Sequence, residues 1–150
     1  MLSIGVDIGG TKVAAGVVDE DGEILRHLVR PTPSRSPEAV ENAIVEVVDS
    51  LSDGLPVKSA GIGAAGWVDT EQALVRFSPH LAWRNEPLRD RLSERIDLPV
   101  IVDNDANAAA WAEYEFGAGR DSRVMTCITL GTGIGGALVI NGRGFRGRYG

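Results

Sequence analysis

Two glycine-rich turns and one acidic segment contain the residue types in this sequence that could do chemistry. The first turn follows the apolar run at residues 4–6 and contains Asp7, Gly9, Gly10 and Thr11. Backbone N–H groups at glycine are not shielded by a Cβ atom, so this turn could approach phosphate oxygens, with the Thr11 hydroxyl as a further donor. A larger side chain at Gly10 would crowd the phosphate and disfavour a positive φ. Asp7 could hold a hydrated Mg²⁺, which prefers one or two carboxylates together with nucleotide oxygens.

A second glycine-rich turn follows another apolar segment, at residues 130–136. It reads G-x-G-x-x-G through Gly131, Gly133 and Gly136. That pattern is weak by itself, and neither turn has the spacing of a P-loop. Either turn alone is also typical of an ordinary hairpin. Two such turns, far apart in a chain of 150 residues, indicate a nucleotide that is held from two sides.

The acidic segment lies where the apolar run at residues 99–102 meets an alanine-rich stretch. Asp105 would stand at the start of a helix, where the helix dipole favours an ionised carboxylate. Such a carboxylate could accept the proton of a substrate hydroxyl that attacks a γ-phosphate. Asn104 has a donor and an acceptor and could orient neighbouring hydroxyls. The alternative is an ordinary helix cap, because Asp and Asn are common before a helix.

The remaining pattern predicts the elements that must position these residues. Three short strands joined by tight turns come first, and helices then alternate with later strands. We expect strands at residues 3–7, 13–19, 23–30, 59–64, 99–102, 123–130 and 136–140, and helices at 36–51, 88–96 and 106–116. The stretch at residues 76–87 is polar and interrupted by prolines, with Trp83 in its middle, and no helix or strand is assigned to it. The fold class is therefore α/β, with a mixed sheet whose later strands are parallel.

Composition excludes several classes of partner. The net charge of −6 argues against nucleic acid or an anionic membrane surface. No apolar run is long enough to span a bilayer and no basic leader precedes the first strand, so we expect a cytoplasmic protein. The single cysteine, Cys127, lies in an apolar run and is expected in the core. His27 and His80 are too far apart in the sequence to suggest a metal site.

Four segments together resemble the ROK (repressor, open reading frame, kinase) family of sugar kinases. They are residues 7–12, 61–66, 104–109 and 130–136, and the resemblance extends from residue 3 to residue 150. It implies a ribonuclease H-like fold of the actin and hexokinase type, with a first lobe at residues 1–120 and the start of a second lobe at 121–150. It also implies transfer of the γ-phosphoryl group of ATP to the 6-hydroxyl of glucose.

The resemblance implies a role for individual residues. Asp105 matches the catalytic base, and Asn104 and Gly66 match contacts to the sugar. Asp7 matches the residue near Mg²⁺. The two phosphate loops correspond to Gly9, Gly10, Thr11 and Lys12, and to Gly131, Thr132 and Gly133. Position 80 is His in this chain, where members of the family often carry Asn.

The resemblance also sets expectations beyond Gly150. The family's proteins are longer, and their further sugar-binding Glu and His and a cysteine-rich zinc site would follow that residue. We therefore expect zinc only in a carboxy-terminal part, a homodimer for the complete protein, and no glucose phosphorylation by residues 1–150 alone. Three alternatives stay open: a kinase for N-acetylmannosamine or fructose, a lobe that binds sugar or nucleotide without catalysis, and a transcriptional regulator that binds sugar and DNA. The regulators carry a helix-turn-helix before the first glycine turn, whereas six residues precede Asp7 here.

Overall fold

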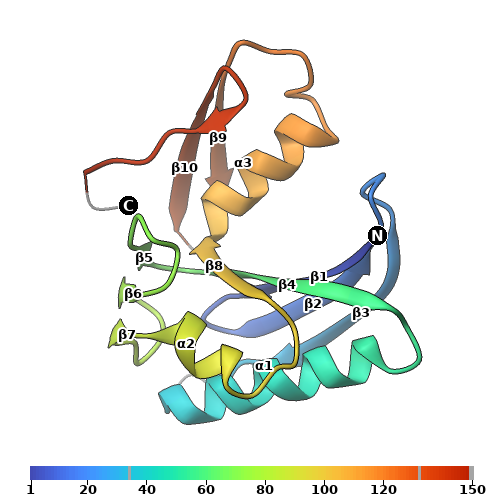
Figure 1. Cartoon of the computed structure of the whole chain (residues 1–150). Helices are drawn as coiled ribbons and strands as arrows, with labels where there is room; N and C mark the ends of the chain where they lie inside the picture. The colour runs from blue at the N-terminus through green and yellow to red at the C-terminus, as the bar shows by residue number, and fades with distance from the viewer. Residues whose placement is uncertain (34, 132, 149–150) are drawn as a thin grey trace.

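A five-stranded mixed sheet forms the centre of the molecule (Figure 1). The computed structural model describes residues 1–33, 35–131 and 133–148. The strands lie in the order β3-β2-β1-β4-β8, with β1, β2 and β3 antiparallel and β4 and β8 parallel to β1. Their bounds are β1 Leu2–Ile8, β2 Lys12–Val18, β3 Ile24–Pro31, β4 Val57–Ala64 and β8 Val100–Asn104. The predicted order is confirmed for the strands of this sheet and for the helices that follow them in the chain.

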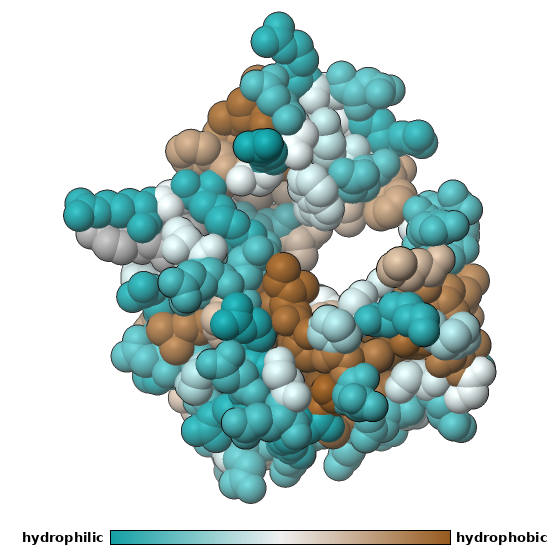
Figure 2. Space-filling model, in the orientation of Figure 1, coloured by the Kyte–Doolittle hydropathy of each residue, from teal (hydrophilic) through white to brown (hydrophobic). Residues whose placement is uncertain are grey.

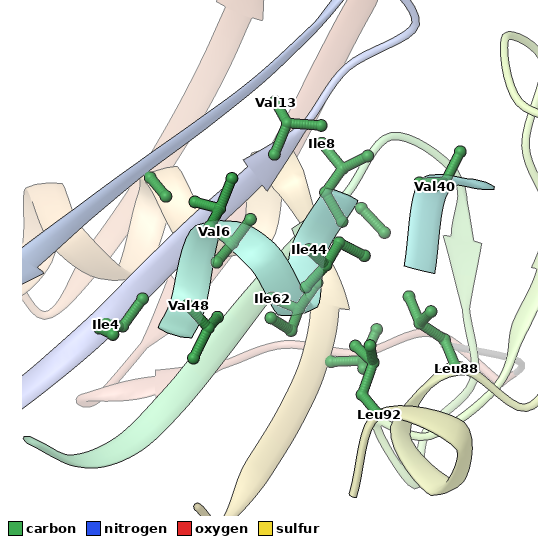
Figure 3. Packing of buried hydrophobic residues seen from close by; sticks show 14 of the residues in the cluster. Ile4, Val6, Ile8, Val13, Val40, Ile44, Val48, Ile62, Leu88 and Leu92 are labelled. Atoms are coloured by element: carbon green, nitrogen blue, oxygen red, sulfur yellow. The ribbon is translucent and has the colours of Figure 1, made fainter. Parts of the chain in front are cut away.

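Helix α1 (Pro37–Ser52) covers one face of this sheet, together with the short helix α2 (Leu88–Ser93) (Figure 1). Ser36 caps α1, because its side chain accepts a hydrogen bond from the Ala39 N–H at 3.3 Å, and Pro37 occupies the first turn. The apolar stripe of α1 packs on alternate residues of β1, as Figure 3 shows for Ile44, Val48 and the β1 side chains. This stripe and the buried faces of β1, β2 and β4 form the hydrophobic core.

Alternation along the strands decides which residues face away from α1. Ile4, Val6 and Ile8 of β1 are buried in the core, so Asp7 lies on the opposite face. In the strand register, Asp7 lies beside Gly63 of β4, and Gly63 lies beside Asp103 of β8. Two carboxylates therefore share one row of the sheet, with only a glycine between them.

Helix α3 (Asp105–Glu115) leaves the end of β8 on the other side of the sheet (Figure 1). It packs against a separate sheet with the order β11-β10-β9. Its strands are β9 Val124–Leu130, β10 Ile134–Ile140 and β11 Arg143–Gly144. The face of the β9–β10 hairpin that points away from α3 is apolar and open, with Leu130 and Ile134 79% and 81% exposed. Strand β10 begins two residues before the predicted start.

The stretch at residues 76–87, to which the sequence assigned no element, contains two short strands. It contributes most of a small antiparallel sheet of β5 (Trp67–Val68), β6 (Val75–Phe77) and β7 (Arg84–Glu86). Trp83 anchors it, because this side chain is 0% exposed and belongs to the main core. Among the residues that the structure describes, no helix is long and apolar enough to cross a membrane.

Candidate functional site

A cleft of about 1620 Å³ lies between the open face of the five-stranded sheet and the unit formed by α3 and the hairpin (Figure 2). It brings together residues that are far apart in the sequence. The predicted site residues that line it are Asp7, Gly9, Gly10, Thr11, Gly66, Asn104, Asp105, Gly131 and Gly133. Lys12 does not line the cleft and lies exposed at the start of β2. Thr132 lies outside the described residues.

The first glycine turn is held by three hydrogen bonds. The Gly9 N–H donates to the Lys12 carbonyl at 3.0 Å, and Thr32 donates its hydroxyl to the Gly9 carbonyl at 2.7 Å and its N–H to the Thr11 carbonyl at 3.0 Å. The Gly9 donor is therefore used inside the turn. Within the described part of the chain, the N–H groups of Gly10 and Thr11 donate to no other group. These two donors, with the Thr11 hydroxyl, are available to an anion.

Gly10 is required by a neighbour rather than by its backbone conformation. Neither Gly9 nor Gly10 has a positive φ, contrary to the reason that the sequence suggested. A Cβ atom at position 10 would lie 2.6 Å from the Cβ atom of His80. The loop that contains His80 therefore packs directly on the first glycine turn. Sequence reasoning missed this contact, since 70 positions separate the two residues in the numbering.

Asp7 lies in an electrostatic environment that suits a cation. Desolvation in the cleft raises the pKa of its carboxyl above the usual value, and the nearby negative charge of Asp105 raises it further, while Lys12 opposes both. A divalent cation held near Asp7 would relieve this repulsion. The carboxylates present therefore fit Mg²⁺, which needs few protein ligands when phosphates supply others.

Asn104 organises the junction between β8 and α3. Its side-chain oxygen accepts a hydrogen bond from the Asn107 N–H at 3.1 Å, which makes it the cap of α3. Its amide group donates to the Gly66 carbonyl and to Asp105 Oδ1, both at 2.9 Å. Both amide hydrogens are thus used within the protein, and only a lone pair of the oxygen is left for a ligand.

Asp105 is held by one of its two carboxylate oxygens. Oδ1 accepts hydrogen bonds from the Asn104 side chain and from the Ala106 N–H, each at 2.9 Å. Oδ2 accepts no hydrogen bond from any residue that the structure describes. The carboxylate is therefore fixed in orientation while one oxygen stays available to a hydroxyl in the cleft.

Gly66 lies beside this junction and beside an aromatic group. A Cβ atom at position 66 would collide with the Phe77 carbonyl oxygen, so close packing against β6 requires glycine. The exposed ring of Trp67 lies 5.5 Å from the ring of Phe77, and the Arg84 guanidinium stands 4.2 Å from the centre of the Phe77 ring. Sequence reasoning missed this aromatic wall, which lines the cleft next to Gly66.

The second glycine turn joins β9 and β10 next to the first turn of α3. The Gly131 N–H donates to the Gly133 carbonyl at 2.9 Å. No atom lies within 4 Å of the positions where Cβ atoms would stand at Gly131 and Gly133. In contrast, a Cβ atom at Gly135 would lie 2.8 Å from the Cβ atom of Ala106, so this glycine lets the hairpin pack on the start of α3.

Comparisons with known proteins identify the family of this chain. The model of the ROK family matches residues 3–150. A glucokinase of Streptomyces coelicolor is 52% identical over 99% of this chain and 47% of its own length. An N-acetylmannosamine kinase of Escherichia fergusonii is 38% identical over 95% of this chain and 49% of its own length.

A solved structure of a ROK family protein has the same fold as this chain. The crystal structure of a ROK family glucokinase from Streptomyces griseus in complex with glucose and AMPPNP has a TM-score of 0.96 and 53% identity, and covers 100% of this chain and 48% of that one. The predicted α/β fold of the actin and hexokinase ATPases is thereby confirmed. The chain spans about half the length of these relatives. By the match to the family model and by these likenesses, the chain belongs to the ROK family.

Proposed function

We propose that this chain carries the catalytic base and the two phosphate-binding turns of an ATP-dependent hexose kinase that acts on the 6-hydroxyl of glucose. The observation that carries the proposal is the carboxylate of Asp105, which has one oxygen fixed and the other free in a cleft that both glycine turns line.

In the proposed reaction, the free oxygen of Asp105 accepts the proton of the sugar 6-hydroxyl as the hydroxyl oxygen attacks the γ-phosphorus of ATP, and ADP leaves. The N–H groups of Gly10 and Thr11 hold phosphate oxygens on one side. On the other side Thr132 and Gly133 of the second turn do so, since the Gly131 N–H already donates to the Gly133 carbonyl. Mg²⁺, held near Asp7, would neutralise charge on the phosphates. Phosphoryl transfer needs little covalent chemistry from the protein, so positioning and electrostatics supply most of the catalysis.

The relatives support this assignment and leave the acceptor to experiment. Glucokinases of Streptomyces share more than half of their aligned residues with this chain, and one of them is described in complex with glucose and AMPPNP. The likeness to an N-acetylmannosamine kinase favours that sugar as the second candidate. Gly66 and Asn104 are proposed to contact the sugar, because their mutual hydrogen bond places both next to Asp105.

A chimera tests the proposal most directly. Residues 1–150 are joined to the part of the Streptomyces coelicolor glucokinase that follows its matched half, and ADP release is measured with glucose, N-acetylmannosamine, fructose and no sugar. We expect release that depends on glucose and a loss of about 10²–10⁴-fold in Asp105→Asn. The matched control is Asp49→Asn on the exposed face of α1, which should retain activity.

Two results would contradict the proposal. Near-normal turnover by Asp105→Asn would show that Asp105 only helps to start α3. A preference for N-acetylmannosamine over glucose would support the kinase activity but show that glucose is not the acceptor. The chain of 150 residues is assayed alongside, with calorimetry of AMPPNP binding as its separate readout.

A further inference from the structure

Asp103, the last residue but one of β8, receives an unusual number of hydrogen bonds for a residue without an assigned role. Its carboxylate stands on the open face of the sheet, two residues before Asp105. Five donors reach it: the Asn104 N–H at 2.7 Å, Gln72 Nε2 at 2.9 Å, Asn107 Nδ2 at 3.2 Å, Arg146 Nη1 at 3.0 Å, and Arg146 Nη2. This one side chain therefore joins the turn before β6, the first turn of α3 and the segment after β11.

Arg146 provides the charged part of this network. Its two terminal nitrogens contact the two oxygens of Asp103, one each, which is the bidentate geometry that fixes orientation as well as charge. The Arg146 and Asp103 side chains are only 25% and 20% exposed. Limited contact with water strengthens the attraction compared with a surface ion pair.

A short series of hydrogen bonds connects Arg146 to Asp105. Asp103 accepts from Arg146 and from the backbone N–H of Asn104, and the Asn104 side chain donates to Asp105 Oδ1. Asn107 closes the series, since its side chain donates to Asp103 and its N–H donates to Asn104. The orientation of the Asp105 carboxylate thus depends on a network that Arg146 completes by binding Asp103, 43 positions before it in the sequence.

Arg146 also fixes the hairpin to the same place. The Phe145 N–H donates to the Leu138 carbonyl at 2.7 Å, which holds the segment just before Arg146 against β10. At its other end, β10 packs through Gly135 on Ala106 at the start of α3. The ion pair is a second attachment between the hairpin and the junction, and it constrains where the second glycine turn lies relative to Asp105.

We propose that Arg146 is a positioning residue for Asp105. By binding Asp103 with both nitrogens, it fixes the strand–helix junction that carries Asn104 and Asp105, and it aligns the second glycine turn with that junction. The consequence for catalysis rests on the proposed kinase function. Loss of this contact should misplace the base relative to the phosphate, and small misplacements remote from the reacting atoms lower rates by up to about 100-fold.

Kinetics of the chimera described above separate positioning from mere stabilisation of the hairpin. Arg146→Gln should lower kcat about 10- to 100-fold with less than about a threefold change in the KM for ATP, at a temperature far below the melting transition. Arg146→Lys keeps the charge but cannot bind Asp103 with two nitrogens. Its kcat should therefore lie between that of the parent chimera and that of Arg146→Gln. The control Arg143→Gln makes the same charge change on exposed β11 and should leave kcat within about twofold of the parent.

A double-variant cycle tests whether the two side chains act as one unit. Asp103→Asn retains an oxygen for the Asn104 N–H but loses the charge that Arg146 binds, so it should resemble Arg146→Gln. The double variant should be no slower than the slower single variant, because the second change removes nothing further. Additive losses would overturn the proposal, as would an Arg146→Gln variant that behaves like Arg143→Gln.

The chain of 150 residues, without the added part of the chimera, gives a readout that does not depend on activity. In ¹⁵N NMR spectra, Arg146→Gln should shift the backbone and side-chain amide signals of Asn104 and speed the hydrogen exchange of the Asn104 N–H about tenfold or more, whereas Arg143→Gln should change neither. Unchanged Asn104 signals in Arg146→Gln would refute the positioning role. If the parent chimera releases no ADP with any sugar, the proposed function fails, and these spectra alone decide whether Arg146 fixes the junction.

Discussion

Replacement of Gly10 by alanine should destabilise the chain, because the His80 loop fills the space that a side chain would need. The added Cβ atom would lie 2.6 Å from His80 Cβ and 3.3 Å from His80 Cγ. Neither atom is the flexible end of a side chain, so the loop or the turn must move. Overpacking of this kind costs about 1–3 kcal/mol in the free energy of unfolding. In a chain of this size, each kcal/mol lowers Tm by about 2–4 °C.

Two other glycines of the same turns serve as matched controls in urea unfolding followed by circular dichroism. A Cβ atom at Gly9 would have an ordinary contact of 3.5 Å with the Lys12 carbonyl oxygen, and one at Gly131 would meet no atom within 4 Å. Since neither residue has a positive φ, Gly9→Ala and Gly131→Ala should be neutral or stabilising by about 0.4–1 kcal/mol.

A second substitution at the contact identifies its cause. The overlap is with the Cβ atom of His80, so His80→Ala should not restore the stability of Gly10→Ala, whereas His80→Gly should restore most of it in the double variant. The reasoning is wrong if Gly10→Ala is as stable as Gly9→Ala. It is also wrong if His80→Ala rescues as well as His80→Gly, because the imidazole ring would then be the obstacle.

Three further predictions concern charge and capping. Burial, and next Glu86, raise the pKa of Glu41 against the opposing effect of Arg91 and Arg95, so the folded chain keeps this proton to a higher pH than the unfolded chain. The stability that Glu41 contributes is then complete below the unfolded pKa of about 4.5 and is lost as the pH rises through the pKa of the folded chain. In Glu41→Gln, the urea midpoint should therefore fall less over this pH range than it does in the parent chain. In ¹³C NMR titrations, Asp105→Asn should lower the pKa of Asp7 while desolvation keeps it above 3.8, and an unchanged pKa would show that the two carboxylates do not interact. Ser36→Ala should lower the free energy of unfolding by about 1 kcal/mol through loss of the α1 cap, whereas Ser36→Thr should keep most of it; equal stability of the two variants would contradict the capping role.

Local patterns in the sequence predicted the main elements well, because each depends on residues close together in the chain. The alternation of Ile4, Val6 and Ile8 determines which face of β1 is buried, and the helical spacing of Val40, Ile44, Val47 and Val48 does the same for α1. The same alternation placed Asp7 on the open face. The capping alternative for Asn104 was also visible from its position before an alanine-rich segment.

The contacts that complete the candidate site were beyond such patterns. Asp103 and Arg146 are 43 positions apart, and Arg146 has no local feature that sets it apart from other arginines in its segment. Gly10 and His80 meet only because a loop folds back on the first turn. Strands of two or three residues, such as β5 and β6, are too short for a periodic signal, so the small sheet around Trp83 was not predicted.

Helix α3 is joined to β8 of the five-stranded sheet and also packs on the hairpin, and this arrangement determines how the cleft could open and close. The hairpin lies along this helix (Figure 1). Gly135 contacts Ala106 at one end and the Gly142 turn lies near Tyr114 at the other, so the helix and the hairpin would move as one rigid unit. This unit is joined to the five-stranded sheet through the junction at Asn104 and Asp105. An eleven-residue helix is about 16 Å long, so a 10° rotation about this junction would carry its far end about 3 Å. Asp105, at the pivot, would hardly move, which lets the walls of the cleft change separation while the carboxylate keeps its place.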